Sequence, residues 1–122
     1  MKIAIASDDG RTISSHFGRT RGFVIFEIED GKVLGEEYRP NTFTGHARGL
    51  HHSGHGHYDT HGDIINALRD CNVVISHGMG RRLYDDLRSA GIQVIVTEET
   101  DVKRALELYL SGNLKDFPEL TD

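Results

Sequence analysis

Two short segments place histidine and arginine beside glycine, and these residue types suit the binding of an anion or a metal. The first segment is SHFGRTR, residues 15–21, and the second is HGMGRR, residues 77–82. Imidazole nitrogens bind transition metals, whereas guanidinium groups add fixed positive charge and forked hydrogen-bond donors. Glycine lets a ligand approach the backbone, and a helix that begins near Gly80 would direct free N–H groups at it. Together these features favour an anionic ligand.

A purely structural explanation of the same residues stays open. Arg81 and Arg82 could be solvated residues of a first helical turn, and Gly78 and Gly80 could be ordinary turn glycines. A G-x-G-R turn alone is weak support for a binding site. The functional interpretation becomes stronger if the segment around His16 lies beside this turn.

The third candidate is the histidine-rich segment GHARGLHHSGHGHYDTHGD, residues 45–63, which holds six of the eight histidines. Imidazole suits zinc, nickel or copper, so this composition predicts some transition-metal binding. A structural zinc site usually has anchored ligands, often with cysteine, whereas the interspersed glycines here predict a mobile arm. A solvated loop with incidental histidines is the alternative. The predicted metal-binding residues are His46, His51, His52, His55, His57 and His61.

Hydrophobic periodicity predicts the elements that must position these segments. Residues 2–7 carry apolar side chains on both faces of the strand alternation, which is typical of a central strand. Asp30-Gly31 is a strong hairpin signal between two further strands, and Gly91 is a typical helix stop. The predicted strands are residues 2–7, 22–29, 32–39, 73–76 and 92–97, and the predicted helices begin near 63, 80 and 101 and end near 71, 90 and 110.

The order β-β-β-α-β-α-β-α predicts an α/β fold with a mixed five-stranded sheet flanked by helices. The first strand should lie between the hairpin and residues 73–76. The loops 8–21 and 77–82 would then emerge at one edge of the sheet, where ligands of such folds collect. In the second helix we expect Leu83, Leu87 and Ala90 to face inward, and we expect the polar tail, about residues 113–122, to fray.

Composition limits the function classes. The chain has 122 residues, enough for a single domain with one core, and no apolar run approaches the length of a membrane span. A net charge of −5 argues against general nucleic-acid binding. The single cysteine, Cys71, fits a reducing cytoplasm and lies on an apolar helical stripe, which predicts a packing role. Asp8 and Asp9 could serve a metal-dependent nuclease, although Asp9-Gly10 is more simply a turn.

Several motifs, in order, resemble the dinitrogenase iron–molybdenum cofactor biosynthesis family. They are MKIAIASDDG, SHFGR, the histidine- and glycine-rich middle, VVISHGMGRR and YLSGNL, and the similarity runs from Met1 to about Leu114. The family includes NifX, NafY, the C-terminal part of NifB and the orange protein. The resemblance implies a ribonuclease-H-like three-layer fold without nuclease activity. It also implies binding or carriage of an anionic metal–sulfur cluster, of iron–molybdenum or another molybdenum-containing type, or of its precursor.

Residue chemistry and resemblance lead to one hypothesis: a non-catalytic carrier that holds a cluster or thiometallate anion at the sheet edge, with the histidine arm, about residues 42–60, folding over it. Cluster-donor or acceptor proteins would be its partners, without nucleic acid or membrane. The alternatives are a divalent-metal buffer or sensor that uses only the arm, a nuclease, and a protein-interaction module. The predicted cofactor-binding residues are His16, Phe17, Gly18, Arg19, His77, Gly78, Gly80 and Arg81.

Overall fold

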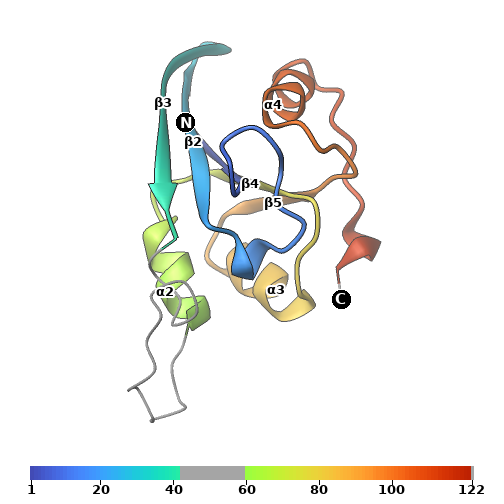
Figure 1. Ribbon diagram of the computed structural model, residues 1–122. Coiled ribbons are helices and arrows are strands. Elements are labelled where there is room, and N and C mark those ends of the chain that lie inside the picture. Colours follow the sequence, from blue (N-terminus) through green and yellow to red (C-terminus); the bar gives the residue numbers. More distant parts are fainter. Residues whose placement is uncertain (42–59, 122) are drawn as a thin grey trace.

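The chain forms an α/β structure around one mixed sheet, seen in Figure 1 as a computed structural model. The structure describes residues 1–41 and 60–121, and in them the strand order is β3-β2-β1-β4-β5. The strands are β1 (Lys2–Ala6), β2 (Gly22–Glu29), β3 (Lys32–Pro40), β4 (Val73–Ser76) and β5 (Gln93–Val96). The helices are α2 (Thr60–Ala67), α3 (Arg81–Ser89) and α4 (Val102–Leu110), with short 3₁₀ turns η1 (Phe17–Arg19) and η2 (Pro118–Leu120).

Strand β1 occupies the centre of the sheet, as its two-sided apolar pattern predicts. It pairs antiparallel with β2, where Ile3 lies opposite Phe26, and parallel with β4, where Ile3 lies opposite Val73. Residues 3–6 are fully buried. The predicted position of β1 between the hairpin and residues 73–76 is therefore confirmed.

Helices cover both faces of the sheet, with α2 and α3 on one side and α4 on the other (Figure 1). The first apolar cluster joins alternate strand residues such as Ala4 and Val74 to Leu68 and Leu87. The second joins Ile3 and its neighbours on the opposite face to α4. None of the helices in the described residues is long and apolar enough to cross a membrane.

The hairpin between β2 and β3 turns at Asp30 and Gly31, as the sequence predicts. Both residues have positive φ angles, 52° and 76°, which match the twist of a two-residue hairpin turn. Strand β3 forms an edge of the sheet and is mostly exposed.

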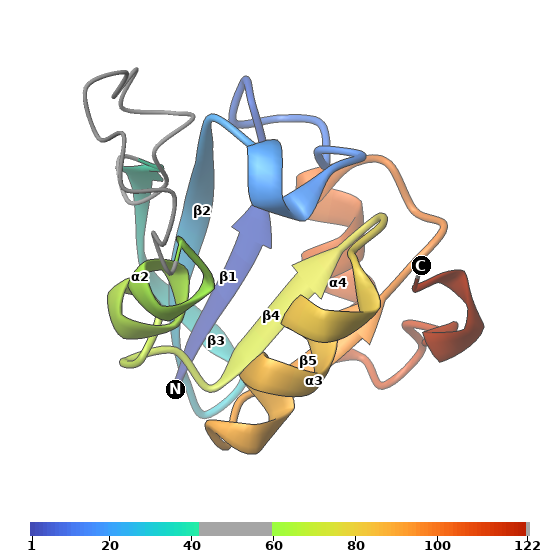
Figure 2. The same cartoon turned by 90° about the horizontal axis from the view of Figure 1, so that it is seen from below.

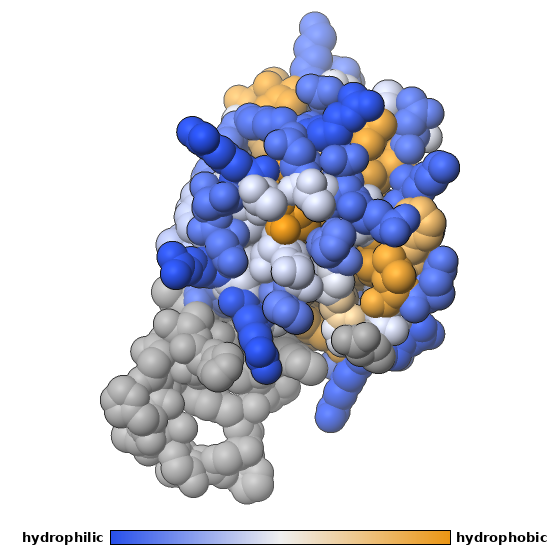
Figure 3. Space-filling model, turned by 45° about the vertical axis from the view of Figure 1, so that its right-hand side comes forward, coloured by the Kyte–Doolittle hydropathy of each residue, from blue (hydrophilic) through white to orange (hydrophobic). Residues whose placement is uncertain are grey.

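Figure 3 shows that hydrophilic residues cover most of one face of the molecule, with apolar residues confined to small patches.

Three expectations about helix ends and the tail are wrong. Helix α2 begins at Thr60 and ends at Ala67, whereas the apolar stripe predicted a helix from 63 to 71. Ala90 is exposed because α3 has already ended and this residue is its C-cap, followed by Gly91 with a φ of 85°. The tail packs against β5: the Val96 N–H donates to the Asp116 carboxylate at 2.9 Å, and the Phe117 N–H donates to the Val96 carbonyl at 2.8 Å.

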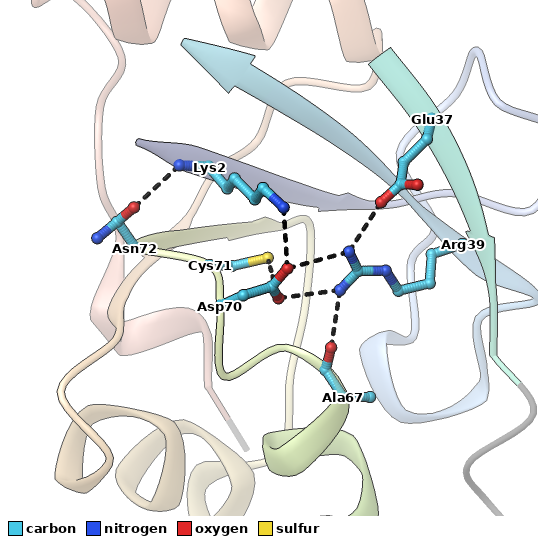
Figure 4. Close-up of polar contacts among 7 residues, drawn as sticks. All are labelled: Lys2, Glu37, Arg39, Ala67, Asp70, Cys71 and Asn72. Atoms are coloured by element: carbon cyan, nitrogen blue, oxygen red, sulfur yellow. Dashed lines mark hydrogen bonds and ion pairs between the residues drawn. The ribbon is translucent and has the colours of Figure 1, made fainter. Parts of the chain in front are cut away.

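A polar network joins β3 to the chain after α2 (Figure 4). The Arg39 guanidinium donates to the Ala67 carbonyl at 2.7 Å and to both carboxylate oxygens of Asp70 at 3.0 and 3.2 Å. A cation beside the last carbonyls of a helix satisfies acceptors that the helix leaves unpaired. Lys2 adds a third contact to Asp70 at 3.2 Å. The hydrogen bonds from Arg39 hold the pKa of the Asp70 carboxyl well below its usual range.

We expect Asp70→Asn to lower the free energy of unfolding by about 1 kcal/mol at pH 7, a modest effect because Asp70 is half exposed. The depressed pKa gives a stabilisation that is fully present above the unfolded-state pKa of about 4 and declines as pH falls below it. Urea unfolding should therefore show the two proteins converging as the pH is lowered from 7 to 3. Glu107→Gln, in an exposed pair with Arg104, is the control and should change little at either pH. A constant difference across this range would contradict the assignment.

Candidate site at the carboxyl edge of β1 and β4

The segments after β1 and β4 lie side by side at one edge of the sheet (Figure 2). We call residues 8–21 the β1 loop and residues 77–80 the β4 turn. The Phe17 N–H donates to the Gly78 carbonyl at 3.3 Å. A Cβ atom on Gly78 would lie 3.0 Å from the Ser15 carbonyl oxygen, so glycine allows this close approach. The predicted apposition of the two segments is confirmed.

Two aspartates close the β1 loop. One carboxylate oxygen of Asp9 accepts the N–H groups of Arg11 and Thr12, each at 2.8 Å, and these bonds lower the pKa of Asp9. Asp8 accepts the Arg21 N–H at 2.8 Å and the Thr20 hydroxyl at 3.3 Å. Both carboxylates, which the sequence offered as nuclease candidates, are thus hydrogen-bonded to the loop's own backbone. This observation favours the turn interpretation.

Phe17 anchors the loop to the core. Its ring is fully buried and lies 5.2 Å from the Phe23 ring, centroid to centroid. The three neighbours predicted with it, His16, Gly18 and Arg19, are exposed. Phe17 therefore positions η1 from the core side, while its neighbours face outward at the sheet edge.

The β4 turn is held by the residue before it. The Ser76 hydroxyl donates to the Gly78 carbonyl at 2.7 Å and lies 3.1 Å from the Gly78 N–H, which donates to it. His77 is half-buried, and its Nδ1 atom lies 3.3 Å from the Glu99 carbonyl oxygen. Gly80 is the N-cap of α3 and makes no side-chain cap hydrogen bond. The N-terminus of α3, with the N–H groups of its first turn, therefore lies at this edge of the sheet.

The Arg81 side chain makes contacts along α3 and with the tail. Its guanidinium lies 3.4 Å from the Asp85 carboxylate, 5.3 Å from the centre of the Tyr84 ring and 3.4 Å from the Thr121 hydroxyl. The ion pair is exposed, so it contributes only about 0–1 kcal/mol. Redirecting Arg81 toward a bound anion would give up this weak pair together with the contacts to Tyr84 and Thr121.

Comparison with known proteins supports the family resemblance that the sequence motifs indicate. Residues 1–112 match the family described as dinitrogenase iron-molybdenum cofactor. The chain belongs to this family. An uncharacterized protein of Methanocaldococcus jannaschii is 33% identical over 96% of this chain and 92% of its own length.

Two further proteins are similar to the chain, one in sequence and one in fold. The FeMo cofactor biosynthesis protein NifB of Herbaspirillum seropedicae is 27% identical over 76% of this chain, which corresponds to 17% of that longer protein. The apo form of the orange protein of Desulfovibrio gigas has a TM-score of 0.71 at 22% identity, covering 95% of this chain and 92% of its own. The second likeness shows a shared fold.

The predicted metal ligands of this family member fall largely outside the described residues. His46, His51, His52, His55 and His57 lie there, and His61 lies in α2 with its side chain not described. Among the residues that the structure does describe, no group of three or more His, Cys, Asp or Glu side chains could hold a metal ion.

Cys71 is buried, and this burial raises the pKa of its thiol to about 12. The thiol therefore stays protonated at neutral pH and is a poor cluster ligand. Its packing role, predicted from the apolar stripe, is confirmed by its place in the first apolar cluster.

Sequence reasoning missed several residues whose hydrogen bonds shape the edge. Tyr38 donates its hydroxyl to the Ser7 carbonyl at 3.0 Å, and the Asn41 amide donates to the Thr20 carbonyl at 2.9 Å. Glu99, whose carbonyl oxygen contacts the His77 ring, was also missed. These contacts join residues 21 to 31 positions apart, so short-range patterns hold little information about them. A serine at the carboxyl end of an apolar strand, such as Ser7 or Ser76, was the one available signal.

We expect Gly78→Ala to destabilise the protein by about 1–3 kcal/mol, because the added methyl group forces the β4 turn away from the β1 loop. Amide NMR shifts should change at Ser15–Phe17 as the Phe17–Gly78 bond lengthens. Gly35→Ala is the matched control, since its Cβ would meet nothing within 4 Å. Equal stability of the two variants, with unchanged shifts in the β1 loop, would show that the contact does not constrain the edge.

Proposed function

We propose that this protein is a non-catalytic carrier of an anionic metal–sulfur cluster or its precursor, bound where the β1 loop meets the β4 turn. One observation carries the proposal: a hydrogen bond joins Phe17 to Gly78, 61 positions further along the chain, and so brings together segments 15–21 and 77–82, which both contain histidine and arginine. Family membership supports the same ligand class. The strand order is compatible with the ribonuclease-H-like arrangement that we propose for the fold.

The residues at the edge would bind different parts of the cargo, according to their chemistry. His16 and His77 offer imidazole nitrogens as ligands for metal atoms. Arg19 and Arg81 supply positive charge and donors for sulfide, with Arg81 leaving its weak pair with Asp85. Gly18 and Gly80 leave the backbone open to close approach, whereas Gly78 lets the β1 loop pack against the β4 turn. The N–H groups of the first turn of α3 add to the attraction for an anion.

The histidine-rich arm, about residues 42–60, is proposed to contribute further donors over the bound cargo, in a cytoplasmic setting with cluster-donor and acceptor proteins as partners. A divalent-metal buffer that uses the arm alone is the second candidate, favoured by six histidines within residues 46–61. Zinc, nickel or copper would be its ligand. A variant lacking residues 45–57 separates the two functions: a buffer would lose all metal binding, whereas a carrier would keep part of its cluster uptake.

We expect His16→Ala and Arg81→Ala each to weaken anaerobic cluster uptake by about ten- to a hundredfold, because a hydrogen bond or ligand to a charged group contributes about 1.5–3 kcal/mol. Uptake is measured by absorption spectroscopy and elemental analysis. A synthetic iron–sulfur cluster is the probe for both variants, and tetrathiomolybdate is a second probe for Arg81→Ala alone. Circular dichroism should show an intact fold in both variants.

Arg104→Ala is the control for Arg81→Ala, because Arg104 is equally exposed but lies on α4. It should bind both probes as the unaltered protein does. Unchanged uptake by His16→Ala and Arg81→Ala would remove the carrier proposal. A nuclease would instead show hydrolysis that is lost in Asp8→Asn, a result that would also overturn it.

A further inference from the structure

We propose that His77 presents its Nε2 atom as a metal ligand and that this atom selects cargo with an exchangeable metal coordination position. The inference deepens the carrier function and rests on it. Its observation is the contact between the Nδ1 atom of His77 and the Glu99 carbonyl oxygen at 3.3 Å. The residues around Glu99 thereby become part of the site, although no pattern in the sequence marks them.

The Glu99 contact fixes which ring nitrogen carries hydrogen. A carbonyl oxygen can only accept a hydrogen bond, so the Nδ1 atom must be the donor. In the neutral ring the Nε2 atom then holds the free lone pair. Histidines that bind metals commonly have this arrangement, with one ring N–H donated to a backbone carbonyl and the other nitrogen on the metal.

Both sides of the contact are anchored. On the histidine side, the Ser76 hydroxyl holds Gly78 and the Gly78 carbonyl accepts from Phe17. On the carbonyl side, the Thr97 N–H donates to the Ser76 carbonyl at 2.8 Å, and the Glu99 N–H donates to the Thr97 hydroxyl at 3.0 Å. Thr97 is 3% exposed, so its hydroxyl is a buried link in this chain. The ring is therefore oriented before any ligand arrives.

The position of the hydrogen decides what His77 can bind. A neutral Nε2 atom without hydrogen cannot donate to a sulfide, but it can displace a weakly held ligand from a metal. Sulfide atoms would be left to the arginines and backbone N–H groups. His77 should therefore matter for a cluster with an exchangeable metal position and not for tetrathiomolybdate, whose molybdenum is already surrounded by four sulfides.

The first test observes the ring in the protein without cargo. Nitrogen-15 NMR of labelled histidine at pH 8, with His77 assigned by its loss in His77→Asn, should show hydrogen on Nδ1. Thr97→Val removes the hydroxyl that holds Glu99 and should raise the share of the other tautomer, while Thr97→Ser keeps the hydroxyl and should resemble the unaltered protein. Hydrogen on the Nε2 atom of the unaltered protein would overturn the inference.

The second test compares two probes. His77→Asn keeps an amide donor near the Nδ1 position but lacks the Nε2 atom. It should bind a [4Fe–4S] cluster with exchangeable thiolate ligands about tenfold more weakly, and so should Thr97→Val, as is typical when a supporting partner of a metal ligand is lost. Pulsed EPR of the reduced cluster should lose a histidine nitrogen coupling in His77→Asn. Binding of tetrathiomolybdate should be unchanged in both variants.

The outcomes separate this inference from the carrier function. Equal losses for both probes in His77→Asn, or equal retention of both, would overturn the role of the Nε2 atom while leaving uptake dependent on His16 and Arg81. Loss of that dependence would overturn the carrier function, even with the hydrogen found on Nδ1.

Discussion

The mixed pairing of β1 determines where the chain can place its reactive side chains. Because β1 runs parallel to β4, the carboxyl ends of both strands lie at the same edge, and the loops that follow them meet there. Because β1 pairs antiparallel with β2, the β1 loop leaves and re-enters the sheet at this same edge, where β2 begins at Gly22. Residues 3–6 are fully buried, so a polar substitution in β1 would disturb both apolar clusters and this edge together.

The acidic groups nearest this edge of the sheet have structural partners. Asp8 and Asp9 accept backbone N–H groups of the β1 loop, and Asp85 pairs with Arg81. A carboxylate that accepts several N–H groups keeps its position and is shielded in part by their dipoles. The exposed arginines of the β1 loop thus stand beside a backbone already stabilised by its own aspartates. A net charge of −5 is compatible with a local preference for an anion.

Much of the fold could be predicted from sequence because its strands are apolar and short. The predicted bounds of β2 and β4 agree with the structure, and their β-branched and aromatic residues explain why. The predicted bounds of α2 lie too far along the chain because the residues before the helix are rich in glycine and histidine, which give no apolar periodicity. Ala90 had the right spacing for the core, but the C-cap geometry at the end of α3 overrides the spacing. The contacts of Glu99 and Thr97 depend on tertiary packing, so no local pattern reports them.

The kinds of donor at the edge bear on how a carrier can release its cargo. A thiolate would hold a metal–sulfur cluster tightly, but the one cysteine is buried in the core, with a thiol whose pKa is raised to about 12. Neutral imidazole and exposed guanidinium bind more weakly and can be displaced by an acceptor's thiolates. The ion pair that Arg81 would give up, worth about 0–1 kcal/mol, can re-form when the cargo leaves. An oriented His77 ring together with adaptable arginines would therefore suit the proposed carrier, which must bind an anionic cluster and later release it.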